Sequence, residues 1–197
     1  MKRLLLATLV ALVAGGVVWI RHTPARGEPQ ATLETEPDPG AEGFARATSV
    51  RTFTLPGDHG PHFDFQTEWW YFTGNLEAED GMAFGYQLTF FRRGLVPGPP
   101  PGGPGLSTQQ VFFAHLALTD VRAGTHDFEE RWSRGWAPLA GARSEPFGVW
   151  LEDWRVDGLG GDTTSWRLKA SLHGRPIELS LAARKPLALH GDRGLSA

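Results

Sequence analysis

The stretch Glu68-Trp69-Trp70-Tyr71 places one carboxyl group among three aromatic side chains. A carboxylic acid buried in apolar surroundings stays protonated and can act as a general acid. Neighbouring aromatic faces would stabilise a cation formed by that proton transfer. The stretch has two other interpretations. It could be packing, with Glu68 paired to an arginine such as Arg92 or Arg51, or it could line a pocket for an elongated apolar ligand.

Other titratable side chains lie on both sides of this stretch. Asp58 and His62 belong to a loop that contains Gly and Pro, and functional groups often lie on such loops. Tyr71 and Tyr86 supply phenolic hydroxyl groups. The catalytic candidates are therefore Glu68, Asp58, His62, Tyr71 and Tyr86.

The histidines His59 and His62 are separated by Gly-Pro, whose turn would let both rings reach one metal ion. We interpret them as polar loop residues and predict no metal and no other cofactor. The sequence has no P-loop, no Gly-x-Ser-x-Gly elbow, no dinucleotide fingerprint and no cysteine. Any catalysis would therefore rest on acid–base chemistry without a cofactor.

The elements that position these residues are predicted to be strands. The chain of 197 residues has 25 Gly, 15 Pro and 8 Trp, which favours short strands and many turns. Alternating apolar and polar residues predict eight strands, at residues 50–55, 67–77, 82–92, 109–121, 147–156, 165–172 and 177–184 and from 187 onward. Phe128 and Trp132, four residues apart, indicate one or two helical turns at 127–134. Residues 94–107 are predicted to form a loop.

This pattern predicts an all-β fold. Short connections without long helices exclude a parallel sheet and favour an antiparallel barrel or strongly curled sheet, because closure removes exposed edges. A turn at residues 78–81 would place Trp69 and Tyr71 on one hairpin face with Phe84 and Phe90. Both hairpin faces would then carry aromatic rings and be buried, and Glu68 and Tyr71 would point in opposite directions.

A hydrophobic ligand would be bound by aromatic side chains from this hairpin and the next strand. His115 has Val111, Phe113 and Ala117 on its strand face, which favours a histidine in apolar surroundings over a general base. The candidate ligand-binding residues are Trp69, Trp70, Phe84, Phe90 and His115.

The first 26 residues are predicted to be an export signal. Lys2 and Arg3 precede an uncharged apolar run from Leu4 to Ile20, which indicates a cleaved signal peptide or an uncleaved membrane anchor. Residues 27–45 are rich in Pro, Glu and Gly and predict a flexible tether. The expected location is the periplasm or the outer face of the inner membrane.

Net charge gives no reason to expect a nucleic-acid partner. The chain has 19 basic and 22 acidic residues, and residues 1–26 hold four of the basic ones and no acid, so the remainder has a net charge of −7. This acidic remainder also lacks an electrostatic attraction to anionic lipid, so a membrane tether would depend on the N-terminal segment.

Five runs resemble the family of AttH and the carotenoid 1,2-hydratases (hydroxyneurosporene synthases). They are EWWYFTG from Glu68, FGYQLTFFR from Phe84, AHLALTD from Ala114, PFGVWLEDW from Pro146 and LHGDRGLS from Leu189. The resemblance implies a lipocalin-like fold for residues 46–197. It also implies two tandem barrels in the whole family architecture, so we expect the second lipocalin-like half to be absent from this chain.

The resemblance leads to three functional hypotheses. The first is an exported domain that binds a hydrophobic, isoprenoid or lipid-like small molecule, with an envelope transporter as a partner. The alternative is a hydratase that adds water to an isoprenoid C=C bond by general-acid catalysis, or a secreted hydrolase. In the third, this chain is one half of a two-domain protein and functions only together with the other half. Residues 44–197 alone would then be poorly soluble.

Overall fold

The computed structural model describes residues 39–99, 109–136, 138–160 and 164–195. The predicted signal segment, residues 27–38 of the predicted tether and residues 100–107 of the predicted loop lie outside the described residues. Within the described ranges, no helix has the length and apolar character needed to cross a membrane.

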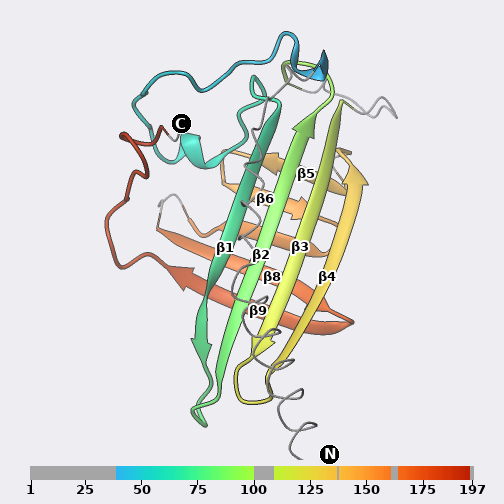
Figure 1. Ribbon diagram of the computed structural model, residues 1–197, viewed down its shortest axis with the longest axis vertical. Helices are drawn as coiled ribbons and strands as arrows, with labels where there is room; N and C mark the ends of the chain where they lie inside the picture. The colour runs from blue at the N-terminus through green and yellow to red at the C-terminus, as the bar shows by residue number, and fades with distance from the viewer. Residues whose placement is uncertain (1–38, 100–108, 137, 161–163, 196–197) are drawn as a thin grey trace, which may run out of the picture. The chain divides into compact units, whose positions relative to one another are not determined.

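Within the described residues, nine strands form two antiparallel sheets (Figure 1). The first sheet has the order β1-β2-β3-β4 and consists of β1 (Thr67–Glu77), β2 (Ala83–Gly94), β3 (Gln110–Asp120) and β4 (Thr125–Arg134). The second has the order β5-β6-β7-β8-β9 and consists of β5 (Ala140–Arg143), β6 (Gly148–Leu151), β7 (Trp154–Gly158), β8 (Ser165–Leu172) and β9 (Arg175–Ala182). Two short 3₁₀ turns, η1 (Pro39–Ala41) and η2 (Gly57–His59), precede β1 in the part of the chain that the structure describes.

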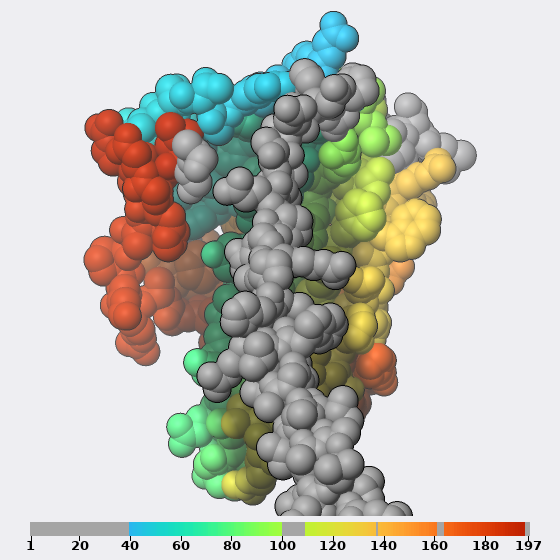
Figure 2. Space-filling model, viewed as in Figure 1, coloured from blue at the N-terminus to red at the C-terminus, as the bar shows by residue number. Residues whose placement is uncertain are grey.

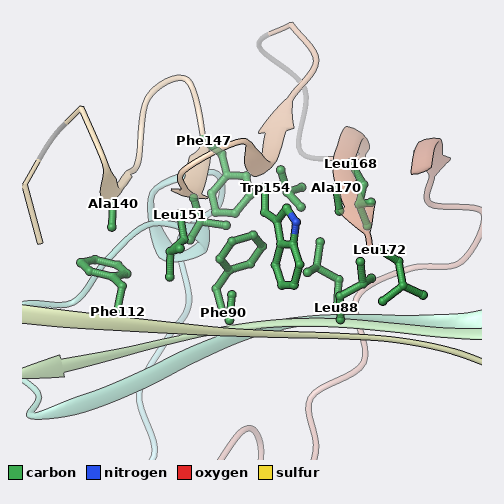
Figure 3. Packing of buried hydrophobic residues seen from close by; sticks show 14 residues of the cluster. Leu88, Phe90, Phe112, Ala140, Phe147, Leu151, Trp154, Leu168, Ala170 and Leu172 are labelled. Carbon is green, nitrogen blue, oxygen red and sulfur yellow. The ribbon is translucent and has the colours of Figure 1, made fainter. Parts of the chain in front are cut away.

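The all-β, antiparallel, lipocalin-like prediction is confirmed. The strands follow one another as neighbours in chain order within each sheet, and the second sheet lies behind the first with its strands running across it (Figure 1). Phe90 and Phe112 of the first sheet point toward Leu151 and Trp154 of the second (Figure 3). Because Phe90, Leu151 and Trp154 are fully buried, the space between the sheets is a packed core.

The β1–β2 hairpin has a different register from the one that a turn at 78–81 predicts. Met82 also belongs to the loop, since the Ala78 N–H donates to the Met82 carbonyl at 2.8 Å and Glu77 pairs with Ala83. Five loop residues instead of four invert the pairing, so residues of like parity share a face. Trp70 therefore lies opposite Phe90 on the core face, and Phe84 and Phe90 do not share a face with Trp69 and Tyr71.

The predicted helical turns at 127–134 are wrong, because these residues form β4 and pair with β3. Phe128 and Trp132 share one side of a helix, but residues four apart also share one face of a strand. The predicted strand 147–156 is instead two strands. Leu151 pairs with Trp154 across a tight turn at Glu152, whose φ of 57° lies in the left-handed region.

Two further predicted strands are absent among the described residues. Residues 50–55 are irregular, and Phe53 packs so closely on Gly194 that a Cβ at that glycine would lie 2.5 Å from the ring. Residues 187–190 form no strand either, and Leu187 and Leu189 are exposed. Both segments therefore run over the surface of the domain as irregular chain and belong to neither sheet.

Arg131 of β4 links the first sheet to the second. Its guanidinium donates to Glu129 at 3.0 Å, to Ser171 at 3.2 Å and to the Asp153 carboxylate. It also stacks over Trp154 with 4.3 Å between its Cζ and the ring centroid. This side chain therefore fixes one edge of the interface between the sheets.

The outward face of the first sheet carries a row of aromatic side chains. Trp69, Phe91, Phe113 and Trp132 are successive cross-strand partners over all four strands. Trp69 is 57% exposed and Trp132 is 71% exposed, while Phe91 is half-buried. The prediction that both hairpin faces are buried is therefore wrong for the described part of the chain.

Candidate functional site

The candidate site lies where the loop after η2 reaches the start of β1. Gly60 packs directly on Ser144. The approach is so close that a Cβ on this glycine would lie 2.0 Å from the serine Oγ. The chain can make this approach only with glycine at position 60. The two histidines on either side of Gly60-Pro61 consequently have different surroundings.

His62 is held between two carboxylates. Its Nδ1 lies 2.6 Å from Glu68 Oε1, and its Nε2 lies 3.0 Å from Asp58 Oδ1. Its backbone N–H also donates to both carboxylate oxygens of Glu68, at 3.0 and 3.1 Å. Both carboxylates are largely buried and the imidazole is about one-third exposed.

Arg51 covers this cluster on its exposed side. Its Nη1 lies 2.7 Å from Asp58 Oδ1 and its Nη2 lies 3.1 Å from His62 Nε2. The guanidinium also lies over the ring of Phe53, with 4.4 Å to the centroid. Asp58 is thereby shared between one permanent cation and one titratable ring.

Arg92 supports the cluster from the core. This fully buried side chain donates from Nε to Glu68 Oε2 at 3.1 Å and from Nη1 to Gln110 Oε1 at 2.7 Å. Its Nη2 donates to the backbone carbonyls of His62, at 2.9 Å, and Phe65, at 2.7 Å. Arg92 therefore fixes both the carboxylate and the loop that carries the histidine.

These contacts shift the pKa values of Asp58 and His62. Burial by itself would raise the pKa of Asp58, but hydrogen bonds from His62 and the Thr54 N–H, together with the Arg51 charge, lower it from 3.8 to about 2. The hydrogen bond to Glu68 raises the pKa of His62 above 6.5, against the effect of burial and with help from Asp58. The arrangement favours an ionised Asp58 and a protonated His62.

A pocket of about 470 Å³, here called the His62 pocket, opens beside this cluster. Its wall combines Arg51, His62 and Glu68 of the cluster with aromatic rings and with residues from both ends of the domain. In Figure 2 the segment that follows residue 40 (blue to cyan) lies against the C-terminal residues (red). The principal lining residues are Arg46, Arg51, Phe53, His62, Phe65, Glu68, Trp69 and Leu195.

The structure brings three of the five catalytic candidates together, namely Asp58, His62 and Glu68. Tyr71 lies on the outward face of β1 and is 58% exposed. Tyr86 lies on the core face near the other end of the hairpin, where burial raises its pKa. Neither tyrosine lines the His62 pocket.

The candidate ligand-binding residues are dispersed. Trp69 lines the His62 pocket, whereas the Trp70 indole points inward and donates to the His59 carbonyl at 2.9 Å. Phe90 is buried in the core and Phe84 lies near the hairpin turn. His115 lies on the outward face, 3.4 Å from Glu130, so it is not surrounded by apolar core.

The sequence-based interpretation missed several pocket residues. Arg46 and Leu195 lie far from the aromatic stretch in the sequence, and nothing local marks either as functional. The sequence suggests Arg51 only as a partner for Glu68, but it pairs with Asp58, and Arg92 is the partner of Glu68. The predicted pairing of Glu68 with an arginine is therefore confirmed at Arg92.

His59 faces a second pocket, of about 380 Å³. Its ring lies 6.0 Å from that of Phe147 and 5.7 Å from that of Trp166, in edge-on geometry. His59 and His62 thus have separate partners and separate pockets. Over the ranges that the structure describes, no group of three or more His, Cys, Asp or Glu is arranged to hold a metal ion.

Comparison with known proteins places the chain in a family. A crystal structure of a candidate AttH from Nitrosomonas europaea matches 77% of this chain, at 30% identity and a TM-score of 0.63. This chain covers 44% of that protein, so it spans less than half of the neighbour's length. A search of curated proteins found no match. The family model described as AttH-like matches residues 46–197, and the chain belongs to the AttH-like family.

Proposed function

We propose that this chain is an exported lipocalin-like domain that binds a hydrophobic, isoprenoid or lipid-like molecule in the His62 pocket. The observation that carries the proposal is the wall of that pocket. Aromatic rings from Phe53, Phe65 and Trp69 adjoin a fixed polar cluster around His62. Pockets with apolar walls and a few oriented polar groups are typical of small-molecule sites.

The packing of the core supports this location for the ligand. Large side chains such as Phe90 and Trp154 are fully buried between the sheets. A ligand as large as an isoprenoid would have to displace them to enter there, at a cost of several kcal/mol. The His62 pocket lies outside this core, beside the edge strand β1.

Ligand binding is tested by titrating farnesol into the full chain and comparing two tryptophan variants. Trp69→Ala removes a ring from the pocket wall, and we expect about a tenfold loss of affinity or more. Trp132→Ala is the matched control, because it removes an exposed tryptophan from the same sheet face at the opposite edge. Equal affinities for both variants would place the ligand elsewhere.

A second candidate function, cofactor-free hydration of an isoprenoid C=C bond, is favoured by the position of His62 between two carboxylates. The lowered pKa of Asp58 makes this carboxyl a poor proton donor, whereas the raised pKa of His62 gives the imidazolium a proton to transfer. That proton would bond to one alkene carbon, and water would add to the resulting cation. The water would return a proton to the imidazole.

Hydration is tested by mass spectrometry, as the gain of one water by a carotenoid or polyprenyl substrate. We expect His62→Gln to abolish turnover, because glutamine cannot donate an imidazolium proton. Glu68→Gln should reduce turnover by removing the charge that stabilises protonated His62. Full turnover in His62→Gln would exclude this hydration chemistry at the site, but it would not contradict the proposal that the pocket binds a ligand.

Export is the remaining part of the proposal, with an envelope transporter as the partner. It rests on the basic start and apolar run of residues 2–20. Alkaline phosphatase fused after residue 45 should be active if the segment directs export. The N-terminal residue of the purified protein, read by mass spectrometry, then distinguishes a cleaved signal from a retained anchor.

A further inference from the structure

We infer that the His62 pocket selects amphiphiles with one anionic head group, a carboxylate or a phosphate monoester on an apolar chain. This inference rests on the proposed binding function and specifies its ligand class. It follows from three features of the pocket. These are its net charge, its side-chain donors without a partner in the described part of the chain, and the two carboxylates of the cluster, which already accept hydrogen bonds.

The charge at the pocket has the opposite sign to that of the body. Arg46, Arg51 and Glu68 are the permanently charged residues of the pocket lining, and the ion-pair partners Asp58 (of Arg51) and Arg92 (of Glu68) add one further charge of each sign. The formal sum is +1 with neutral His62 and +2 with the imidazolium. Because residues 27–197 together carry −7, this positive site is a local exception that attracts an anion.

Three side-chain donors at the pocket, those of Arg46, Thr48 and Ser49, have no partner in the described part of the chain and can receive a head group. Arg46 lines the pocket and is exposed, and its side chain makes no hydrogen bond or ion pair within the described part of the chain. Thr48 and Ser49, whose side chains carry hydroxyl groups, line the same wall. A guanidinium with neighbouring hydroxyls matches the geometry of carboxylate or phosphate oxygens.

The two carboxylates are not available to a cationic ligand. Asp58 already accepts from Arg51, His62 and the Thr54 N–H. Glu68 accepts from His62 and from the buried Arg92. A cationic head would have to displace these bonds and lie near Arg46, so the pocket disfavours it.

Calorimetric titration of the full chain at pH 7 tests the inference with probes that share a dodecyl chain, each below its micelle concentration. Dodecyl phosphate and dodecanoate should bind at least about tenfold more tightly than dodecanol, and dodecylammonium should bind most weakly. Inorganic phosphate alone should not compete. If dodecyl phosphate binds more tightly than dodecanoate, the class is narrowed to phosphate-bearing amphiphiles, and the reverse order narrows it to carboxylates.

Arg46→Gln is the main variant, since the Arg46 side chain has no hydrogen-bond or ion-pair partner among the described residues. We expect it to reduce affinity for the anionic probes about three- to tenfold and to leave dodecanol unchanged. Arg122→Gln, an exposed arginine in the β3–β4 turn, is the matched control and should change neither. All variants retain the same N-terminal residues, so any contribution of these residues cancels.

The outcomes separate this inference from the proposed function. Equal binding of dodecanol and the anionic probes, lost in Trp69→Ala, would overturn the anionic preference and leave hydrophobic binding intact. Competition by inorganic phosphate would also overturn the anionic-amphiphile inference, because it would show that the site binds an anion without an apolar chain attached. No binding of any probe, or binding insensitive to Trp69→Ala, would overturn the proposed function itself.

Discussion

Arg92 and Glu68 form an ion pair that connects the hydrophobic core to the His62 pocket. The Arg92 guanidinium is fully buried, and its Nε lies 3.1 Å from Glu68 Oε2. The two residues are direct cross-strand partners on β1 and β2, so the pairing is set by the hairpin register. The same arginine holds the backbone of the loop that carries His62.

Arg92→Met should lower the free energy of unfolding by about 3–5 kcal/mol, because it removes the hydrogen bonds that the buried guanidinium donates to Glu68, Gln110 and two carbonyl groups. Urea unfolding measures this loss. Arg122→Gln, the surface control, should stay within about 0.5 kcal/mol of wild type. The double variant Arg92→Met/Glu68→Gln should lose less than the sum of its single variants. A strictly additive double variant would contradict the coupling.

Acid should destabilise the protein through Asp58. Its folded pKa of about 2 lies below its ordinary value of 3.8, so its contribution is present above about pH 4 and is lost as the pH falls toward 2. The expected contribution is about 1–2 kcal/mol. Urea unfolding at several pH values should show a shallower acid decline for Asp58→Asn than for wild type. Parallel declines in the two proteins would argue against a folded-state shift at Asp58.

The titration of His62 should depend on Glu68. The raised pKa of His62 means that its contribution to stability is present below about pH 6.5 and is lost as the pH rises through the folded pKa. We expect NMR titration of the imidazole to give a lower pKa in Glu68→Gln, because the hydrogen-bonded carboxylate is the largest cause of the shift. Glu130→Gln, which changes the partner of His115, is the control. An unchanged His62 pKa in Glu68→Gln would show that Glu68 does not control its protonation.

Arg131 should stabilise the contact between the sheets. Arg131→Met keeps part of the packing on Trp154 but removes the hydrogen bonds to Glu129, Asp153 and Ser171. We expect a loss of about 1–2 kcal/mol in urea unfolding, since the partners are partly exposed to solvent. Arg134→Met, at the end of the same strand, should change stability by less than about 0.5 kcal/mol. Similar losses in the two variants would mean that Arg131 has no special role.

The aromatic row on the first sheet should promote self-association of the chain. Replacing Trp132 by Lys should raise solubility and reduce oligomers in sedimentation velocity, because it removes the most exposed large apolar side chain in the described part of the chain. Thermal unfolding should be unchanged, as this ring contributes little to the core. Phe128→Lys, on the same face of the sheet, should likewise raise solubility and reduce oligomers. A monomeric, highly soluble wild type would argue against an apolar interface here.

Local alternation of side chains made much of the fold predictable. Strands β1, β8 and β9 follow a period of two that is readable residue by residue, and the long contiguous motifs made the AttH-like family recognisable. The same period misled at β4, where a spacing of four fits a strand as well as a helix. It also concealed the turn at Glu152, since the flanking residues Leu151 and Trp154 are both apolar.

The site was only partly predictable, because the contacts that assemble it depend on the path of an irregular loop. Glu68, Asp58 and His62 were predicted individually from their residue types, and the separation of Glu68 from Tyr71 followed from strand alternation. Their convergence on one hydrogen-bonded cluster depends on the fold of the loop around Gly60, which the sequence pattern does not encode. The five-residue loop of the hairpin likewise set which residues share a face.

The sequence alone determined the all-β class, the alternation of side chains between the two faces of each strand, and the family. These properties depend on interactions between near neighbours or on contiguous motifs. Only the tertiary structure decided that Arg46 and Leu195, about 150 residues apart, share one pocket with His62. Contacts between distant segments depend on the path of irregular chain over the sheets. The packing of Phe53 on Gly194, which no local pattern specifies, fixes that path here.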